Sequence, residues 1–329
     1  MEQISQRRMV SVIIPNYNYA RFLDERIESI LNQSFQDFEL ILLDDASTDD
    51  SKVIFRHYEH SSHITHICIN SVNSGSPFVQ WEKGFQLATG KYIWIAESDD
   101  LSDPLFLEKM VALMERDEGI SVCFSGSILI DDNGQALVQD EDLWGKNKSK
   151  NNDGYAIFGG IDYIKHNLYW KNYIYNASAV LFRKDCLSGM MNSSCFKMRF
   201  CGDWLFWVEI ASQGKVAEVY QKLNQFRQHE QSTTARARVS GQNIIEDMDV
   251  VKQIERKIPN LGCYRKMLRR GIFYKKIKRI EGCRSMKKRL YGGLKESLGG
   301  DVGSYLAERF NKNLSFIFPW ILTASRDRM

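Results

Sequence analysis

Residues 91–100 read KYIWIAESDD, and this stretch decides how the rest of the chain is interpreted. Its apolar part, residues 92–96, is rich in β-branched and aromatic side chains, which is typical of a buried strand. Three carboxylates follow at once: Glu97, Asp99 and Asp100. Like charges this close repel one another unless a cation neutralises them, and oxygen ligands suit Mg²⁺, Mn²⁺ or Ca²⁺. The alternative interpretation is a solvated acidic turn that precedes the next helix.

The composition indicates a packed, soluble protein of roughly two domains. The chain has 329 residues, of which 43% are hydrophobic and 26% are charged, and its net charge of +3 is too small to indicate nucleic acid as a partner. Its seven cysteines are an odd number without a C-x-x-C pair, which favours reduced thiols over disulfides or a zinc site. The N-terminus has no apolar signal region, and residues 316–322 are too short an apolar run to span a bilayer. We therefore expect a cytoplasmic protein.

Strands and helices alternate through the first hundred residues. Buried strands are predicted at residues 9–15, 38–43, 64–69 and 92–96, with helices at 21–33, from about 50 to 58, and at 77–88. Ser47, Thr48 and Asp49 are suitable N-cap residues for the second helix. This alternation predicts a parallel sheet that is covered by helices.

Two of the predicted strands end in adjacent aspartates, at residues 44–45 and 99–100. Ligands of open α/β sheets bind at the carboxyl ends of the strands, where these aspartates fall. The first strand is followed by PNYNY at residues 15–19 instead of G-x-G-x-x-G, and the chain contains no G-x-x-x-x-G-K-[ST] sequence. A nucleotide site built from carboxylates and a metal is therefore favoured over one built from a glycine-rich loop.

The first domain is predicted to continue to residue 235, and a second, mainly helical domain is predicted at 236–329. After a helix that ends near residue 116, we expect strands at 120–124, 127–130, 177–182 and 223–229, a hairpin-type turn at 131–134 and an aromatic helix at 204–211. Residues 146–153 (KNKSKNND) are expected to form a mobile loop, and residues 231–234 (QSTT) mark the end of the domain.

Four sequence blocks, in this order, resemble the family-2 nucleotide-sugar glycosyltransferases. They are VSVIIPNYNYARFLDERIESILNQSFQDFELILLDDASTDDS (residues 10–51), ATGKYIWIAESDD (88–100), FCGDWLFW (200–207) and FRQHEQS (226–232). The resemblance covers about residues 9–232. It implies the GT-A fold, an α/β architecture with a Rossmann-like, mostly parallel sheet flanked by helices, here followed by a C-terminal helical extension.

The resemblance also implies where a nucleotide-diphosphate sugar would bind. Pro15 and Tyr17 would flank the base, and Asp45 would hydrogen-bond it. Asp99 and Asp100 would hold the ribose and a Mn²⁺ or Mg²⁺ ion, and through this ion the diphosphate. A purely structural alternative for Tyr17 is that its ring packs within the loop.

Asp203 matches the carboxylate that acts as catalytic base in inverting members of the family. Its alternative is a structural one, because Gly-Asp before a helix is also a good N-cap. His229 belongs to a stretch, RQH at residues 227–229, that resembles an R-x-H element near the active site of relatives. An isolated histidine of this kind is either a structural hydrogen-bonding group or a metal ligand.

The sequence departs from the family pattern at two positions. Relatives often have Asp where this chain has Glu97, for which we expect an indirect, water-mediated role. Many relatives carry A-R-N-x-G before the metal-binding strand, but residues 80–84 read QWEKG, so Trp81 stands at the arginine position. Lys83 is an alternative source of the missing charge.

The segment 265–295 carries thirteen basic residues and a single acidic one, Glu281. Ile272, Phe273, Ile277 and other apolar residues are interleaved with them at helical spacing. One interpretation is a basic amphipathic surface for an anionic membrane, which would place the enzyme at the inner face of the cytoplasmic membrane. The other is a helical pair whose apolar stripe packs on the catalytic domain. Nucleic acid is not expected, because its recognition motifs are missing.

Together, these features predict a metal-dependent inverting glycosyltransferase. It would move a sugar from a nucleotide-diphosphate donor, with UDP favoured, to a saccharide or lipid-linked acceptor in surface polysaccharide or glycolipid synthesis. A divalent ion would stabilise the leaving diphosphate, and Asp203 would deprotonate the acceptor hydroxyl. The alternative is a non-catalytic nucleotide-sugar-binding or scaffold module with the same fold. A nicotinamide-dependent oxidoreductase is disfavoured by the missing glycine fingerprint.

Overall fold

The computed structural model describes residues 8–137, 154–190, 193–229 and 241–328. The chain forms two compact units. The first consists of Met1–Gly160, Ile174–Arg199 and Glu209–His229, and the second of Ile161–Tyr173, Phe200–Val208 and Glu230–Met329. The second unit thus takes in two segments that precede the predicted boundary at residue 235. The predicted loop at 146–153 and the predicted boundary segment at 231–234 lie outside the described residues.

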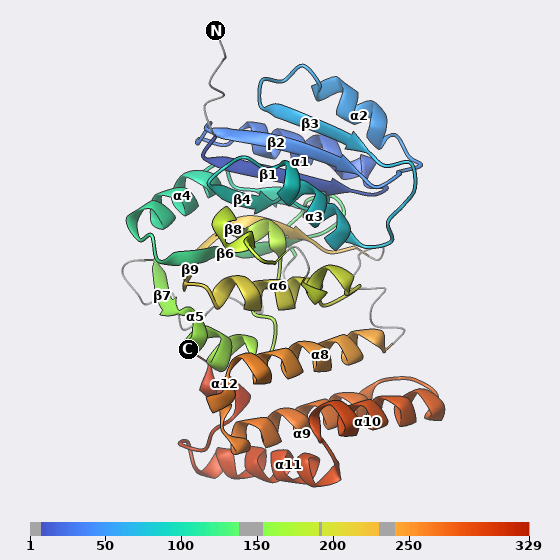
Figure 1. Cartoon of the computed structure of the whole chain (residues 1–329), viewed down its shortest axis with the longest axis vertical. Coiled ribbons are helices and arrows are strands. Elements are labelled where there is room, and N and C mark those ends of the chain that lie inside the picture. Colours follow the sequence, from blue (N-terminus) through green and yellow to red (C-terminus); the bar gives the residue numbers. More distant parts are fainter. Residues whose placement is uncertain (1–7, 138–153, 191–192, 230–240, 329) are drawn as a thin grey trace. The chain divides into compact units, whose positions relative to one another are not determined.

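A single mixed sheet is the framework of the first unit (Figure 1). Its strands are β1 (Val10–Asn16), β2 (Phe38–Asp44), β3 (Ile64–Ile69), β4 (Tyr92–Ile95), β5 (Leu101–Ser102), β6 (Ile120–Ile130), β7 (Tyr155–Gly159), β8 (Val180–Arg183) and β9 (Lys215–Arg227). They are ordered β3-β2-β1-β4-β8-β6-β9-β5, and β7 also pairs with β9. The first four strands are parallel, β8 is antiparallel to both of its neighbours, and β6 and β9 are again parallel.

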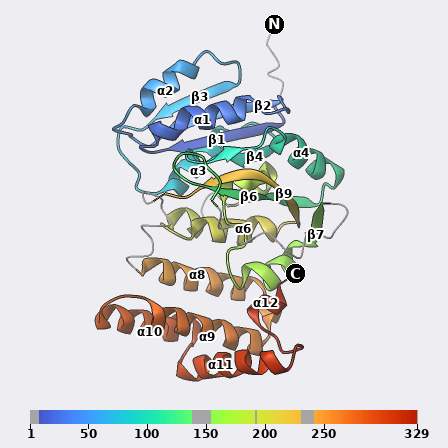
Figure 2. The ribbon, with the colours of Figure 1, turned by 180° about the vertical axis from the view of Figure 1, so that it is seen from behind.

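Helices cover both faces of this sheet, as Figures 1 and 2 show. The helices of the first unit are α1 (Ala20–Leu31), α2 (Ser51–Tyr58), α3 (Pro77–Leu87) and α4 (Phe106–Arg116). Val12 and Ile14 of β1 belong to the core shared with α1, α2 and α4. Ile13 points the other way and meets α3 at Gly84, where a Cβ atom would come within 2.6 Å of its side chain. Strands β1, β2 and β4 are buried along their whole length because helices lie on both sides.

The structure confirms the predicted elements of the first hundred residues and corrects later details. The strand predicted at 177–182 begins only at Val180, after a 3₁₀ turn at Ala177–Ala179. Residues 120–130 form one strand instead of two, because a shift of register near Gly126 bends β6 without ending it. Strand β9 begins at Lys215, earlier than predicted, and β7 was not predicted. Of the predicted cap residues of α2, Asp49 accepts the Ser51 backbone N–H at 3.1 Å, whereas Ser47 bonds to the loop after β1.

The second unit is helical in its described part. Its C-terminal helices are α8 (Gln242–Lys257), α9 (Cys263–Arg279), α10 (Arg284–Leu298), α11 (Val302–Ile317) and α12 (Ala324–Asp327). Two helices, α5 (Gly160–Tyr163) and α6 (Gly202–Ala211), contain residues of both units. No helix of the described residues combines the length and the apolar composition that crossing a bilayer requires.

Several apolar residues of segment 265–295 lie in the interior of this helical unit, whereas Met267, Ile272 and Ile280 are half-buried. Leu268, Phe273 and Ile277 of α9 and Leu290 of α10 are buried, and α10 packs on α8 and α9. Phe273 and Ile277 therefore do not reach a membrane surface, and the prediction is wrong for these two side chains; membrane binding by segment 265–295 stays a prediction. Several basic residues of the segment are also neutralised, as in the ion pair of Arg270 with Glu255 at 3.0 Å.

Candidate active site

The loops after β1 and β2 begin side by side because the two strands pair in parallel up to Asn16 and Asp44. The Asn16 amide donates to Asp44 Oδ1 at 3.0 Å and to Ser47 Oγ at 3.2 Å. The Ser47 backbone N–H donates to Asp44 Oδ2 at 2.8 Å. Ala46 has a left-handed backbone with φ of 62°, which is costly for a residue with a side chain. The loop is thus held in a strained conformation by its hydrogen bonds.

Asp45 is buried and fully engaged by neutral donors. Its carboxylate accepts from Asn70 Nδ2 at 2.7 Å, Gln80 Nε2 at 2.8 Å, and both the backbone N–H and the hydroxyl of Ser74 at 3.0 and 2.8 Å. Lys83 reaches the same network, since its ammonium donates to Asn70 Oδ1 at 2.8 Å. Asp45 therefore anchors the segment after β3, and its bond to a base stays a prediction.

The two residues predicted to flank the base differ in accessibility. Tyr17 is 41% exposed, so its ring is available to a ligand. Pro15 is buried within β1, and its carbonyl oxygen accepts a hydrogen bond from Ser98 Oγ at 2.8 Å. This bond links the loop after β1 to the acidic segment after β4.

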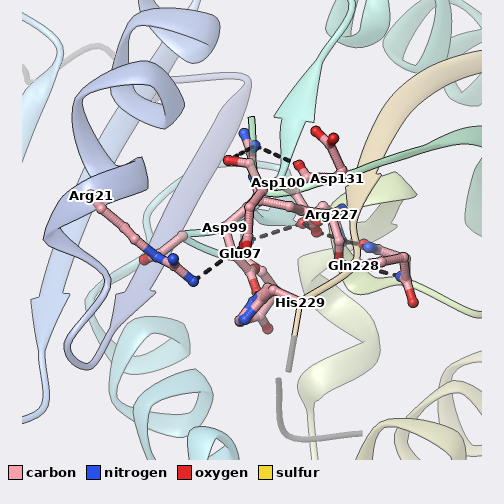
Figure 3. Close-up of polar contacts among 12 residues, drawn as sticks. Arg21, Glu97, Asp99, Asp100, Asp131, Arg227, Gln228 and His229 are labelled. Atoms are coloured by element: carbon pink, nitrogen blue, oxygen red, sulfur yellow. Dashed lines mark hydrogen bonds and ion pairs between the residues drawn. The ribbon is translucent and has the colours of Figure 1, made fainter. Parts of the chain in front are cut away.

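The predicted acidic cluster gathers beyond β4, next to the end of β9 (Figure 3). Asp100 is buried, and its carboxylate accepts from Asn176 Nδ2 at 2.8 Å, Ser178 Oγ at 2.6 Å and the Arg227 backbone N–H at 3.0 Å. The Arg227 side chain donates through Nε to the Asp99 carbonyl oxygen at 2.7 Å. The end of β9 therefore fixes the backbone of the acidic segment as well as one of its side chains.

His229 lies in this cluster, with its Nε2 atom 2.9 Å from Asp99 Oδ2. Its ring packs against Tyr19 and Phe22, with centroid distances of 5.5 and 5.6 Å. Its other nitrogen, Nδ1, is buried without a hydrogen-bond partner in the described part of the chain. The predicted proximity of His229 to the acidic motif agrees with this geometry, and in it the histidine contacts Asp99 directly.

The carboxylates of the cluster are electrostatically uncompensated. Burial raises the pKa of Glu97 to about 8, and repulsion by Asp99 and Asp100 adds to the effect. Burial and repulsion by Asp99 raise the pKa of Asp100 to about 7. Arg26 of α1 is fully buried nearby, with its guanidinium 5.1 Å from the Trp94 ring. Its three nitrogens have no hydrogen-bond partner among the described residues, so it offsets the charge only at a distance.

These residues fit a divalent ion that is shared with a diphosphate. In the described residues, no group of three or more His, Cys, Asp or Glu side chains is arranged to hold a metal ion. Mg²⁺ is usually bound by one or two carboxylates, with substrate phosphates completing its coordination. Asp99 is 18% exposed and Asp100 lies beside it, so the pair meets this requirement. A divalent cation would also relieve the repulsion that raises the pKa values of the cluster.

Glu97 and Trp81, the two residues that depart from the family pattern, contact each other in the structure. The indole Nε1–H of Trp81 donates to Glu97 Oε1 at 3.1 Å, and Trp81 is buried. The Glu97 backbone N–H donates to Ser178 Oγ at 3.0 Å. Trp81 therefore orients Glu97, whereas Lys83 is directed to Asn70 and the Asp45 network.

Asp203 belongs to the second unit, in the first turn of α6. Asn172 Nδ2 donates to its Oδ2 at 2.9 Å. Burial raises the pKa of Asp203 to about 6, although hydrogen bonds from the Trp204 backbone and Asn172 oppose the increase, and repulsion by Asp247 adds to it. Asp203 is therefore ionised at neutral pH, and its pKa is close to the value that suits a general base.

Sequence reasoning missed Arg26, Asn176 and Ser178. The sequence contained a signal for Arg26, because this residue lies four positions after Phe22 and four before Ile30, on the apolar side of α1. An arginine in that stripe is buried and needs a negative partner. Asn176 and Ser178 gave no comparable signal, since a polar pair before a strand is common in loops.

Sequence comparisons point to one family. The family whose model matches residues 11–188 is described as "Glycosyl transferase family 2". An uncharacterized glycosyltransferase of Haemophilus influenzae is 27% identical over 236 residues, 69% of this chain and 68% of that protein. A Bacillus subtilis protein named for teichuronic acid biosynthesis, the glycosyltransferase TuaG, is 34% identical over 130 residues. That match spans 39% of this chain and half of TuaG.

Solved structures share the fold. Residues 1–349 of TarS from S. aureus, in complex with UDP-GlcNAc, align with a TM-score of 0.64 at 16% identity, over 88% of this chain and 81% of that one. The mannosyltransferase PcManGT of Pyrobaculum calidifontis, in complex with GDP-Man and Mn²⁺, aligns with a TM-score of 0.55 at 14% identity, over 96% and 82%. The predicted GT-A fold is confirmed.

Proposed function

The chain belongs to glycosyl transferase family 2, and from this membership we propose that it is an inverting, metal-dependent enzyme that uses a nucleotide-diphosphate sugar. We further propose UDP as the nucleotide and a saccharide or lipid-linked molecule of a surface polysaccharide or glycolipid as acceptor. The names of TuaG and of the TarS complex with UDP-GlcNAc support these choices. The observation that carries the proposal is the uncompensated acidic cluster at the end of β4.

Donor binding is assigned to the loops at the carboxyl ends of the first strands. The exposed ring of Tyr17 stacks on the base, and Asp45 keeps the neighbouring segment in place through Asn70 and Ser74. Asp99 and Asp100 would hold a divalent ion, which would neutralise the charge that develops on the leaving diphosphate. His229 contacts Asp99 and orients its carboxylate.

The transfer step needs one base. The acceptor hydroxyl oxygen bonds to the anomeric carbon as the bond from this carbon to the diphosphate oxygen breaks, and the hydroxyl proton passes to the Asp203 carboxylate. Attack from the side opposite the leaving group inverts the anomeric configuration. With its pKa raised to about 6, Asp203 is both ionised and more basic than an ordinary aspartate at neutral pH.

A non-catalytic binding module with this fold is the alternative function. Such a module would bind the nucleotide sugar without need of Asp203. It would, however, have no use for a buried Asp203 whose pKa is raised to about 6, the range that suits a general base. The catalytic function therefore explains more of the structure.

Thermal unfolding with added ligand tests the proposal, because a ligand that binds only the folded state raises its stability. UDP-GlcNAc, UDP-glucose and GDP-mannose are added separately, with Mn²⁺ or with EDTA. We expect a UDP-sugar to raise the unfolding temperature only with Mn²⁺, and Asp99→Asn to abolish the increase. Glu118→Gln, which removes an exposed acid from the same unit, is the matched control. Equal stabilisation in EDTA would contradict the metal role, and no stabilisation by any nucleotide sugar would contradict the donor assignment.

A further inference from the structure

Helix α11 turns its polar side toward the protein and its apolar side outward. Ser304, Glu308 and Asn311 recur at spacings of four and three residues and are buried. Leu306 and Phe310 lie on the opposite side and are 56% and 65% exposed. A surface helix normally buries its apolar stripe and exposes its polar one. The orientation of α11 is therefore reversed.

Specific contacts with α9 hold α11 in this orientation. Gly271 of α9 allows close approach, since a Cβ atom there would lie 2.4 Å from the Ser304 carbonyl oxygen. Lys275 pairs with Glu308 at 3.6 Å, and the Tyr264 hydroxyl donates to Asn311. Because these polar groups are engaged by α9, rotating α11 to bury its apolar side would leave them unpaired.

The exposed apolar side of α11 continues past the end of the helix. Phe316 and Trp320 are 78% and 79% exposed, and the rings of Phe318 and Trp320 pack at 5.3 Å. The outer face is defined here as Val302, Leu306, Phe310, Phe316, Ile317 and Trp320. A group of exposed large apolar residues that share one side of a helix usually marks a binding surface.

The outer face belongs to a basic part of the chain. Residues 263–317 contain fifteen lysines and arginines against four acidic residues. On α11 itself Arg309 and Lys312 are exposed, and the Lys278 ammonium of α9 lies 5.2 Å from the Tyr305 ring, next to Leu306. Helices α9 and α10 of the same unit add positive charge through exposed basic side chains with no ion pair in the described part of the chain: Arg279, Arg284, Lys288, Arg289 and Lys295.

We propose that the outer face of α11 docks on an anionic lipid surface. The exposed aromatic and aliphatic side chains would enter the headgroup region, while lysines and arginines bind the acidic headgroups. A second copy of the chain is a less suitable partner, because it would bring the same excess of positive charge to the interface. The docking surface thus lies on α11 and not on the apolar residues of segment 265–295. The inference does not depend on the proposed chemistry.

Vesicle flotation of the full-length protein tests the docking. Vesicles of phosphatidylcholine alone are compared with vesicles that also contain phosphatidylglycerol, at low and high salt. We expect flotation only with phosphatidylglycerol and a steep loss at high salt. The double variant Phe310→Ser/Trp320→Ser should reduce partitioning roughly tenfold or more. Arg309→Gln/Lys312→Gln should reduce it roughly thirtyfold, at about 1 kcal/mol for each basic residue.

Matched controls remove similar side chains from the first unit. Val53→Ser/Val72→Ser removes two exposed apolar residues, and Arg56→Gln/Arg116→Gln removes two exposed arginines. Both should float like the wild type. Failure of the wild type to bind phosphatidylglycerol vesicles would overturn the proposal, as would binding that the α11 variants do not weaken. Self-association that is abolished by Phe310→Ser, without vesicle binding, would identify the face as a contact between copies instead.

Discussion

The two aspartate pairs at the strand ends look alike in sequence but differ in their surroundings. Asp44 and Asp45 accept hydrogen bonds from neutral donors, among them Asn16, Asn70 and Gln80. The second pair, Asp99 and Asp100, lies next to a third carboxylate. Hydrogen bonds satisfy the first pair, whereas charge repulsion remains in the second although Asp100 also accepts three hydrogen bonds.

This difference indicates that the first pair stabilises the fold, whereas the second pair is suited to binding a ligand. A carboxylate surrounded by amides and hydroxyls stabilises the folded loop without any ligand. A cluster whose pKa values are raised by burial and mutual repulsion costs stability in the free protein, and proteins retain such costs mainly at functional sites. Arg26 reduces this cost through space only, because its guanidinium does not hydrogen-bond the cluster.

Asp203, a carboxylate that belongs to neither pair, extends the comparison. Its substitution gives the largest expected effect on activity. Like Asp44 and Asp45 it accepts a hydrogen bond from a neutral donor, Asn172, and burial raises its pKa as it raises that of Asp100. We expect Asp203→Asn to lower kcat by roughly two to four orders of magnitude, since a general base contributes that much. Donor affinity, measured by calorimetry, should be unchanged. Turnover of the variant near the wild-type rate would show that Asp203, which lies in the first turn of α6 and not at its N-cap, has only a structural role.

The same substitution in each pair should have opposite effects on stability. Asp45→Asn places an amide group among the donors of Asn70, Ser74 and Gln80, and we expect it to lower the free energy of unfolding by about 3 kcal/mol. Asp99→Asn removes one of the repelling charges and keeps an oxygen for His229, so we expect it to raise the free energy of unfolding by about 1 kcal/mol.

Urea denaturation in EDTA measures both changes on the metal-free protein. Asp132→Asn, an exposed aspartate that pairs with Arg21 at 3.3 Å, is the control and should change stability little. If both Asp45→Asn and Asp99→Asn destabilised the protein equally, the distinction between the two pairs would be wrong.

The elements that sequence reasoning predicted well are those with a simple period. Strands β1, β2 and β4 are continuous apolar runs between turn residues, and only a strand buried on both faces requires such a run. The acidic cluster after β4 could also be predicted, because the carboxyl ends of strands in an open α/β sheet face the ligand. In β6, by contrast, the sequence predicted two strands, at 120–124 and 127–130, although a single strand continues through Gly126.

The unpredicted features depend on contacts between distant segments. Asn176 and Ser178, which precede β8 or adjoin its start, contact Asp100 because β8 pairs with β4 in the sheet. The reversed orientation of α11 follows from Gly271 on another helix, which no property of α11 itself reveals. Sequence period predicts which side of a helix is apolar, but the partner helix decides which side is buried.

The smallest expected effect concerns the pH dependence of transfer. Asp203 must be ionised to accept a proton, and burial raises its pKa to about 6. With saturating metal and donor, which keep the Asp99 and Asp100 site occupied, the rate should therefore be constant above that pH and fall tenfold for each pH unit below it. Asn172 donates to the charged form of Asp203 at 2.9 Å and so lowers the pKa. Removing this donor in Asn172→Ala should move the acid limb to higher pH by about half a pH unit, or ~0.7 kcal/mol.

Profiles of kcat/KM for the wild type and the variant measure this shift. Asn172→Asp is a second variant, whose added negative charge should move the acid limb further in the same direction. An acid limb that stays in place in both variants would mean that it reports a group other than Asp203, and the base would then have to be sought among the remaining carboxylates.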